Sequence, residues 1–190
     1  VKFYRDEFTG KSDSMKFDLE DSTITMFNDP VVWSGKNQIT SDTISFILSD
    51  NNIEEMNLVK NSFIISEDTL KNFNQIKGRQ MKALFDEKNN IQSISVNGNG
   101  ETIYYALDES SENMIGLNYI ICSDLILNFK ENEISNIIFY KEPQAKLIPP
   151  HEISEDDKFI ESFSWREDEK PTIEDVVFYL RKKIYLRNEK

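Results

Sequence analysis

The sequence is poor in cysteine, histidine and positive charge, and each shortage excludes a class of protein. A single cysteine, Cys122, cannot form a disulfide within the chain, which excludes a disulfide-stapled secreted domain. A single histidine, His151, cannot build a zinc site, and it lies in a Pro-rich loop far from Cys122 along the chain. Lys and Arg number 22 against 34 Asp and Glu, and the net charge of −12 argues against a protein that binds nucleic acid. We therefore expect Cys122 to be a small buried hydrophobic side chain rather than a nucleophile.

Alanine and long apolar runs are also scarce. Three alanines stand against 23 isoleucines and 13 phenylalanines, a composition that favours strands over helices. No stretch approaches the roughly 18 apolar residues that a membrane-spanning helix requires. The sequence contains no Gly-rich phosphate loop and no spaced cluster of metal ligands. A length of 190 residues suits about one domain, and we predict an all-β protein that is not an enzyme and uses no cofactor or metal.

The sequence does contain a repeated strand–turn–strand unit. Asn37-Gln38-Ile39 is echoed by Asn74-Gln75-Ile76, and four copies of the unit align with successive offsets of 29, 37 and 44 residues. The alternating apolar positions of the first strand are Met15, Phe17 and Leu19; Ile44, Phe46 and Leu48; Met81, Ala83 and Phe85; and Leu125, Leu127 and Phe129. After a polar turn, the return strand carries Ile24, Phe27 and Asp29; Ile53, Met56 and Leu58; Ile91, Ile94 and Val96; and Ile134, Ile137 and Phe139.

This pattern predicts a layered sheet. Alternation places the aligned side chains on one face of each strand. Two strands cannot bury such a face alone, so stacked copies are expected to form a continuous apolar wall. The segments between the units, including residues 63–66 and 102–106, are predicted to be further strands.

Several segments resemble recurrent sequence motifs of the OstA-like proteins of lipopolysaccharide transport, the periplasmic bridge family of Gram-negative bacteria. These segments are DPVVWSGKNQITSD at 29–42, FNQIKG at 73–78, VNGNGETIYY at 96–105, GLN at 116–118 with CSD at 122–124, and FSWR at 163–166. The last two fit the larger OstA-like variants. The ordered series carries the resemblance, which covers about residues 8–171.

The resemblance implies a fold and a ligand. Residues 1–150 are expected to form an open, twisted β-jellyroll, a β-taco of stacked strand pairs, and its apolar interior is expected to bind the acyl chains of lipid A. Burial of a dozen methylenes at about 0.8 kcal/mol each would outweigh a few screened rim charges. The expected lipid-binding groove consists of Met15, Phe17, Leu19, Ile24, Phe27, Ile44, Phe46, Leu48, Met56, Leu58, Met81, Phe85, Ile94, Val96, Leu125, Leu127, Phe129, Ile137 and Phe139.

The resemblance also implies partners and a location. Jellyroll modules of the bridge or of the outer-membrane translocon are expected to pair with this chain edge to edge, and head-to-tail self-association would use the same edges. The strands near residues 1–8 and 137–148 are the candidate outer edges. The expected location is the periplasm, peripheral to the outer membrane. Because the chain begins at Val1 without Met, we expect a mature or excised fragment of a longer protein.

Residues 151–190 differ in character from the rest of the chain. Residues 151–170 carry eight acidic and three basic residues, and Ser154 is a candidate helix N-cap. We expect Trp165 to pack this acidic segment over the open end of the sheet as a cap. Residues 173–187 are predicted to form a short C-terminal helix, which is either a solvated end or a docking helix for a partner.

Three alternatives remain at this point. A structural or adhesive β-solenoid would have the same strands around a dry, closed core. A polysaccharide-active β-helix enzyme would need two or three carboxylates converging on one water or metal. Within lipopolysaccharide transport, the chain could instead be the periplasmic domain of the outer-membrane translocon, where a following barrel of alternating strands would be expected.

Overall fold

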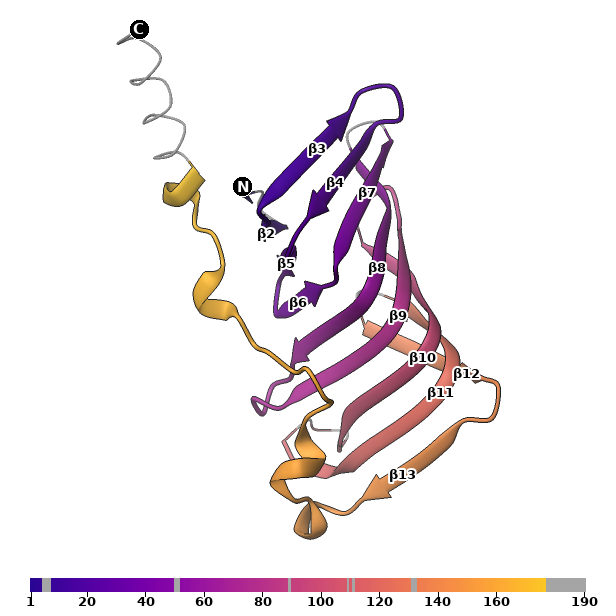
Figure 1. Ribbon diagram of the computed structural model, residues 1–190. Coiled ribbons are helices and arrows are strands. Elements are labelled where there is room, and N and C mark those ends of the chain that lie inside the picture. The colour runs from indigo at the N-terminus through magenta and orange to yellow at the C-terminus, as the bar shows by residue number, and fades with distance from the viewer. Residues whose placement is uncertain are drawn as a thin grey trace, which may run out of the picture.

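The computed structural model describes residues 1–4, 8–49, 52–88, 90–108, 110, 112–130 and 133–176. These residues form one antiparallel sheet of thirteen strands and three short 3-10 helices (Figure 1). The strands are β1 (Lys2–Tyr4), β2 (Thr9–Lys11), β3 (Ser14–Asp18), β4 (Thr23–Phe27), β5 (Val31–Ser34), β6 (Asn37–Thr40), β7 (Thr43–Ser49), β8 (Asn52–Glu67), β9 (Phe73–Phe85), β10 (Ile91–Leu107), β11 (Met114–Lys130), β12 (Glu133–Tyr140) and β13 (Gln144–Ile148). The 3-10 helices are η1 (Pro150–Glu152), η2 (Glu155–Lys158) and η3 (Glu167–Glu169).

The sheet is folded into two wings that share the long strands β8 to β11 (Figure 1). The first wing, wing A, joins β3, β4 and β7 to residues 52–59, 80–85, 91–97 and 124–130 of the long strands, and ends at β12. The second wing, wing B, joins β1, β2, β5 and β6 to residues 62–67, 73–78, 100–107 and 114–122, and ends at β13. The predicted all-β, open architecture is confirmed.

Left-handed residue pairs form the crease between the wings. On β8 the register shifts between Val59 and Ser62, and on β10 it shifts between Asn97 and Gly100. The intervening pairs Lys60–Asn61 and Gly98–Asn99 all have positive φ, as do the pairs at 28–29 and 141–142 that connect one wing to the other. Asn and Gly adopt this conformation at the lowest cost, so the polar sequence at these points bends the strands.

The four predicted strand pairs are confirmed as β3–β4, β7–β8, β9–β10 and β11–β12. In the last three pairs a register shift follows the first isoleucine of the return strand, which explains why the next aligned residue comes three positions later. The first pair has no such shift: Ile24 pairs with Phe17 and Met26 with Met15. The alignment of Phe27 and Asp29 with the other copies was therefore wrong, and Asp29 lies in an exposed turn.

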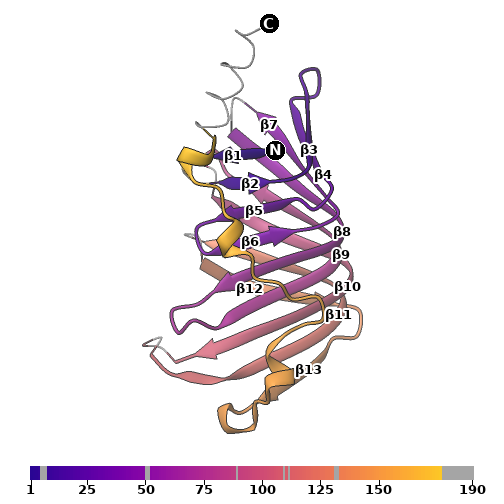
Figure 2. The ribbon, with the colours of Figure 1, turned by 60° about the vertical axis from the view of Figure 1, so that its left-hand side comes forward.

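Residues 149–171 form a segment, here called the strap, that crosses the outer face of wing B from β13 towards β1 (Figure 2). Its Ile160, Phe163 and Trp165 pack with outward side chains of wing B, including Phe73, whose ring centroid lies 5.0 Å from that of Trp165. The predicted cap over the open end of the sheet is thus corrected. The segment covers a face of the sheet, where it packs on outward apolar residues of wing B such as Phe63, Ile65 and Ile103.

Short polar contacts shape the strap and the chain beyond it. Ser154 is the N-cap of η2, as predicted, and its backbone N–H donates to Asp157 Oδ2 at 2.9 Å. A helix begins at residues 173–176, and the remainder of the helix predicted over 173–187 lies outside the described residues. Within the described ranges, no helix has the length and apolar character needed to cross a membrane.

Candidate functional site

The inner face of wing A carries rows of apolar side chains that run across its strands. Cross-strand neighbours form one unbroken row of Met15, Met26, Ile44, Leu58, Met81, Val96, Leu125 and Phe139. A second unbroken row consists of Phe17, Ile24, Phe46, Met56, Ala83, Ile94, Leu127 and Ile137. A third level is made of the pairs Leu48 with Ile53, Phe85 with Ile91, and Phe129 with Ile134. The sequence repeat therefore corresponds to three levels of one apolar wall.

Wing B supplies the opposing wall. Its inner row consists of Phe3, Gly10, Val32, Ile39, Ile64, Ile76, Thr102, Ile120 and Ala145. Gly10 is required there because the Phe3 ring fills its space: an added Cβ would lie 2.2 Å from Phe3 Cε1. Inner residues of both wings belong to a single hydrophobic cluster, so the two walls pack together.

The interior is buried in the middle and open at both sheet edges. Ile44, Met56 and Leu125 have no exposed surface. At the β3 edge, however, Phe17 is 54% exposed, and at the β13 edge Leu147 is 60% exposed. An apolar path therefore runs the length of the molecule and ends at solvent on both sides.

Most of the predicted groove residues meet in this interior. Ten of the nineteen lie in the buried part of the cluster, and six more pack at its margin: Met15, Ile24, Leu48, Phe129, Ile137 and Phe139. Phe27 instead lies on the opposite face of β4 from the fully buried Met26 and outside the cluster, and Leu19 is 79% exposed beyond the end of β3. The inner row of wing B was missed, because its members lie on short strands or on halves of long strands outside the aligned units.

An aromatic pair joins the wings on the side away from the crease. Phe8, which precedes β2 in wing B, and Phe85, at the end of β9 in wing A, meet edge to face with ring centroids 5.9 Å apart. Both rings are buried, with exposed fractions of 5% and 7%. The contact closes the interior at this point.

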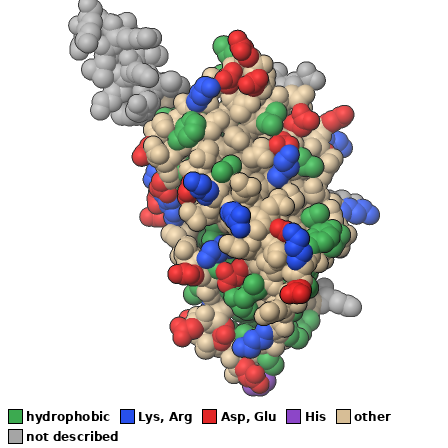
Figure 3. Space-filling model, turned by 45° about the vertical axis from the view of Figure 1, so that its right-hand side comes forward, with side chains coloured by type: hydrophobic (Ala, Val, Ile, Leu, Met, Phe, Trp, Pro, Cys, Tyr) green, Lys and Arg blue, Asp and Glu red, His purple; other side chains and the backbone are tan. Residues whose placement is uncertain are grey.

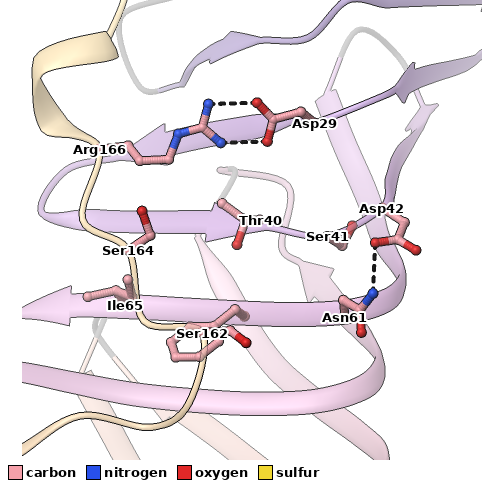
Figure 4. Close-up of a pocket in the computed structure, with 10 residues that line it drawn as sticks. Asp29, Thr40, Ser41, Asp42, Asn61, Ile65, Ser162, Ser164 and Arg166 are labelled. Carbon is pink, nitrogen blue, oxygen red and sulfur yellow. Dashed lines mark hydrogen bonds and ion pairs between the residues drawn. The ribbon is translucent and has the colours of Figure 1, made fainter.

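A polar cavity of about 430 Å³ lies between the strap and the crease (Figure 4). Arg166 reaches across its rim and donates to both carboxylate oxygens of Asp29, at 2.7 and 2.8 Å. Glu169 accepts from Arg166 and from Lys11, and these hydrogen bonds hold the pKa of Glu169 at about 2. Inside the cavity, Asn61 Nδ2 donates to Asp42 Oδ1 at 3.0 Å. The charged groups here are paired in a structural network.

A second polar cavity of about 430 Å³ lies further along the crease. Asp124 accepts there from Gly98 N at 2.9 Å and from Lys141 Nζ at 2.6 Å, and hydrogen bonding to Lys141 is the main cause of its lowered pKa. The described part of the chain contains no group of three or more His, Cys, Asp or Glu side chains that could hold a metal ion.

Cys122 belongs to the interior wall. Its side chain is 5% exposed, and burial, followed by the nearby Asp124 charge, raises the pKa of its thiol. A raised pKa disfavours the nucleophilic thiolate, so the residue packs as a small hydrophobic group.

The surface is mixed in charge. On the face shown in Figure 3, Lys and Arg side chains are interspersed with Asp and Glu, and hydrophobic side chains emerge between them. This face therefore presents no continuous basic field to a polyanion.

These features define a class of fold: an open β-jellyroll made of one folded sheet with an apolar interior. Among solved structures, this chain is similar to LptH, the LptA-homologous periplasmic component of the lipopolysaccharide transport device of Pseudomonas aeruginosa. The two align with a TM-score of 0.53 and 12% sequence identity over 74% of this chain and 93% of that chain. The chain thus has an LptA-like fold. No protein-family model matches its sequence, and no curated protein sequence does.

Proposed function

We propose that this protein binds the acyl chains of lipopolysaccharide between its two wings and passes them to neighbouring modules across the periplasm. The observation that carries the proposal is the apolar path, which crosses the whole sheet and reaches solvent at both edges. Support comes from the fold, which resembles that of a periplasmic component of lipopolysaccharide transport. A core that served stability alone would gain nothing from exposed apolar ends.

The energetics favour binding of the lipid through its acyl chains. A saturated chain of a dozen methylenes gains roughly 10 kcal/mol gross on leaving water, before ordering costs. The walls have to separate to admit it, since the interior side chains contact one another directly. Four methionines lie in the cluster or at its margin, Met15, Met26, Met56 and Met81, and flexible thioether side chains can repack around a ligand.

The sheet edges offer the means of transfer. β1 and β3 end the sheet on one side, and β12 and β13 end it on the other. The expected edges near residues 1–8 and 137–148 include β1, β12 and β13, whereas the edge at β3 was not anticipated. Unpaired backbone groups on such strands can bond to the next module by strand addition. Stacking would join the apolar paths end to end, and the location of such a bridge is the periplasm, up to the outer membrane.

Site-specific photo-crosslinking in Gram-negative cells tests the proposal. A photoreactive amino acid at Phe46, Phe85 or Phe129, which line the interior, should capture lipopolysaccharide. The matched control is Ser45, whose side chain points to the opposite face of the strand that carries Phe46. Capture at Ser45 equal to that at Phe46 would contradict the proposal. It would favour instead a ligand-free structural protein with a dry core.

A further inference from the structure

The inner face of wing B carries a second row of side chains, further from the crease than its apolar row, and this row is polar. Ser34, Asn37, Ser66 and Asn74 are successive cross-strand neighbours on β5, β6, β8 and β9. Tyr104 and Asn118 are neighbours on β10 and β11. Each of the six lies two positions along its strand from a residue of the apolar row, so all six point inward. We call these six residues the polar row.

The polar row retains its hydrogen-bonding capacity. Asn74 uses one acceptor, since its Oδ1 accepts from Tyr105 N at 2.8 Å. In the described part of the chain, the side chains of the other five have no hydrogen-bond partner. All six are at least partly exposed, and Tyr104 is 41% exposed. The polar row therefore forms a solvent-accessible margin beside the apolar row of wing B.

The opposing wing is different at this level. The third level of wing A, with Leu48, Phe85 and Phe129, is apolar. The polar row and the third level of wing A face each other near the N-terminus. Phe8 precedes β2, which pairs with the strand that carries Ser34, and its ring contacts Phe85 of the third level. The interior is thus amphipathic across its width, with one polar margin along wing B.

We propose that the polar row binds sugar hydroxyl groups in the head group of a glycolipid whose chains lie on the apolar rows. Amide and hydroxyl side chains both donate and accept, as sugar hydroxyls do. The row carries no cation for a phosphate in a chain of net charge −12. The inference rests on the proposed function and adds to it the orientation of the ligand: the sugar lies along wing B and the tails lie towards wing A and the crease.

Two uncharged detergents with the same chain test the inference. Dodecyl maltoside and octaethylene glycol dodecyl ether, below their micelle concentrations, compete with a fluorescent fatty acid bound to the purified protein. The maltoside should bind more tightly, by about fivefold for each hydrogen bond of ordinary net strength. In the variant Asn37→Leu/Asn118→Leu this preference should fall towards one, with the affinity for the ether unchanged.

A second variant and a control guard against loss of folding. Ser66→Ala/Tyr104→Phe removes only two hydroxyl groups and should also reduce the preference. Gln80→Leu, on the outer face of wing A, should keep the wild-type preference. Equal binding of the two detergents by the wild-type protein, or an unchanged preference in both variants, would overturn the inference alone. Failure of the fatty acid and both detergents to bind would contradict the proposed function itself.

Discussion

Gln38 and Gln75 hold the strap by the same pair of hydrogen bonds. Gln75 Nε2 donates to Lys158 O at 2.8 Å and its Oε1 accepts from Ile160 N at 2.9 Å. Gln38 repeats this arrangement six residues further along the strap, with Ser164 O at 2.7 Å and Arg166 N at 2.6 Å. Both glutamines are almost fully buried, so each amide acts as a strand neighbour for two backbone groups of the strap.

Replacing Gln75 should therefore be costly. Gln75→Leu keeps the size of the side chain but leaves Lys158 C=O and Ile160 N–H without partners beneath the strap. At about 1–3 kcal/mol for each of the two unsatisfied groups, the free energy of unfolding should fall by roughly 2–6 kcal/mol. Urea denaturation measures the change. The exposed Gln80→Leu should cost less than about 0.5 kcal/mol, and a similarly small effect at Gln75 would show that the strap is not held through this amide.

The Arg166–Glu169 contact should make the protein sensitive to acid. Because the pKa of Glu169 is about 2 in the folded state, against 4.5 ordinarily, its stabilising contribution is complete above pH 4.5. It is lost as the pH falls from 4.5 towards 2, where the unfolded chain takes up the proton first. Glu169→Gln should therefore show a smaller loss of stability than the wild type between those limits. Urea midpoints at successive pH values measure it, with the exposed Glu161→Gln as control; equal slopes in all three proteins would contradict the prediction.

Close packing at the crease should make Gly78 intolerant of a side chain. An added Cβ would lie 2.2 Å from Val96 Cγ1, and Val96 is fully buried. Gly78→Ala should destabilise the protein by about 1–3 kcal/mol. In the Val96→Ala background the same change should cost at least about 1 kcal/mol less, since the clashing methyl is gone. A double-mutant cycle measures this coupling, and strictly additive effects would refute the steric explanation.

Cys122 offers a test of the interior without mutation. As the only thiol in the chain, buried and with a raised pKa, it should react with Ellman's reagent at least about 100-fold more slowly in the folded protein than in urea. That factor corresponds to an opening free energy of about 3 kcal/mol. A native rate close to the unfolded rate would mean that the walls are open to solvent.

The strand pairs and the apolar wall of wing A could be predicted because their signals are local. Alternation at residues 44–48 or 125–129 and a polar turn fix a hairpin within about fifteen residues. The first copy misled the alignment because a bulge present in the other three is absent from it. The local sequence does not distinguish Phe27 from Met26 as the inward residue. Phe27 would point inward if this strand had the bulge found in the other three copies, but without the bulge Met26 points inward.

The strap and wing B could not be predicted in the same way. Gln38 bonds to residues 126 and 128 positions away in the chain, a separation at which no periodicity operates. The repeated Asn-Gln-Ile motif at residues 37–39 and 74–76 was recognised in the sequence, but only as evidence of an internal repeat. The structure explains it: Ile39 faces the interior, and the adjacent Gln38 faces outward to the strap.

The course of the strap also sets the order in which the molecule is completed during synthesis. The residues of the inner walls precede residue 149, so the two apolar walls can assemble before the strap leaves the ribosome. Until then Phe63, Ile65 and Ile103 have no cover on their outward side. The outer face of wing B is consequently an uncovered apolar surface for the last part of translation, and a nascent chain stalled before Ile160 would present to chaperones or proteases the surface that the finished molecule hides.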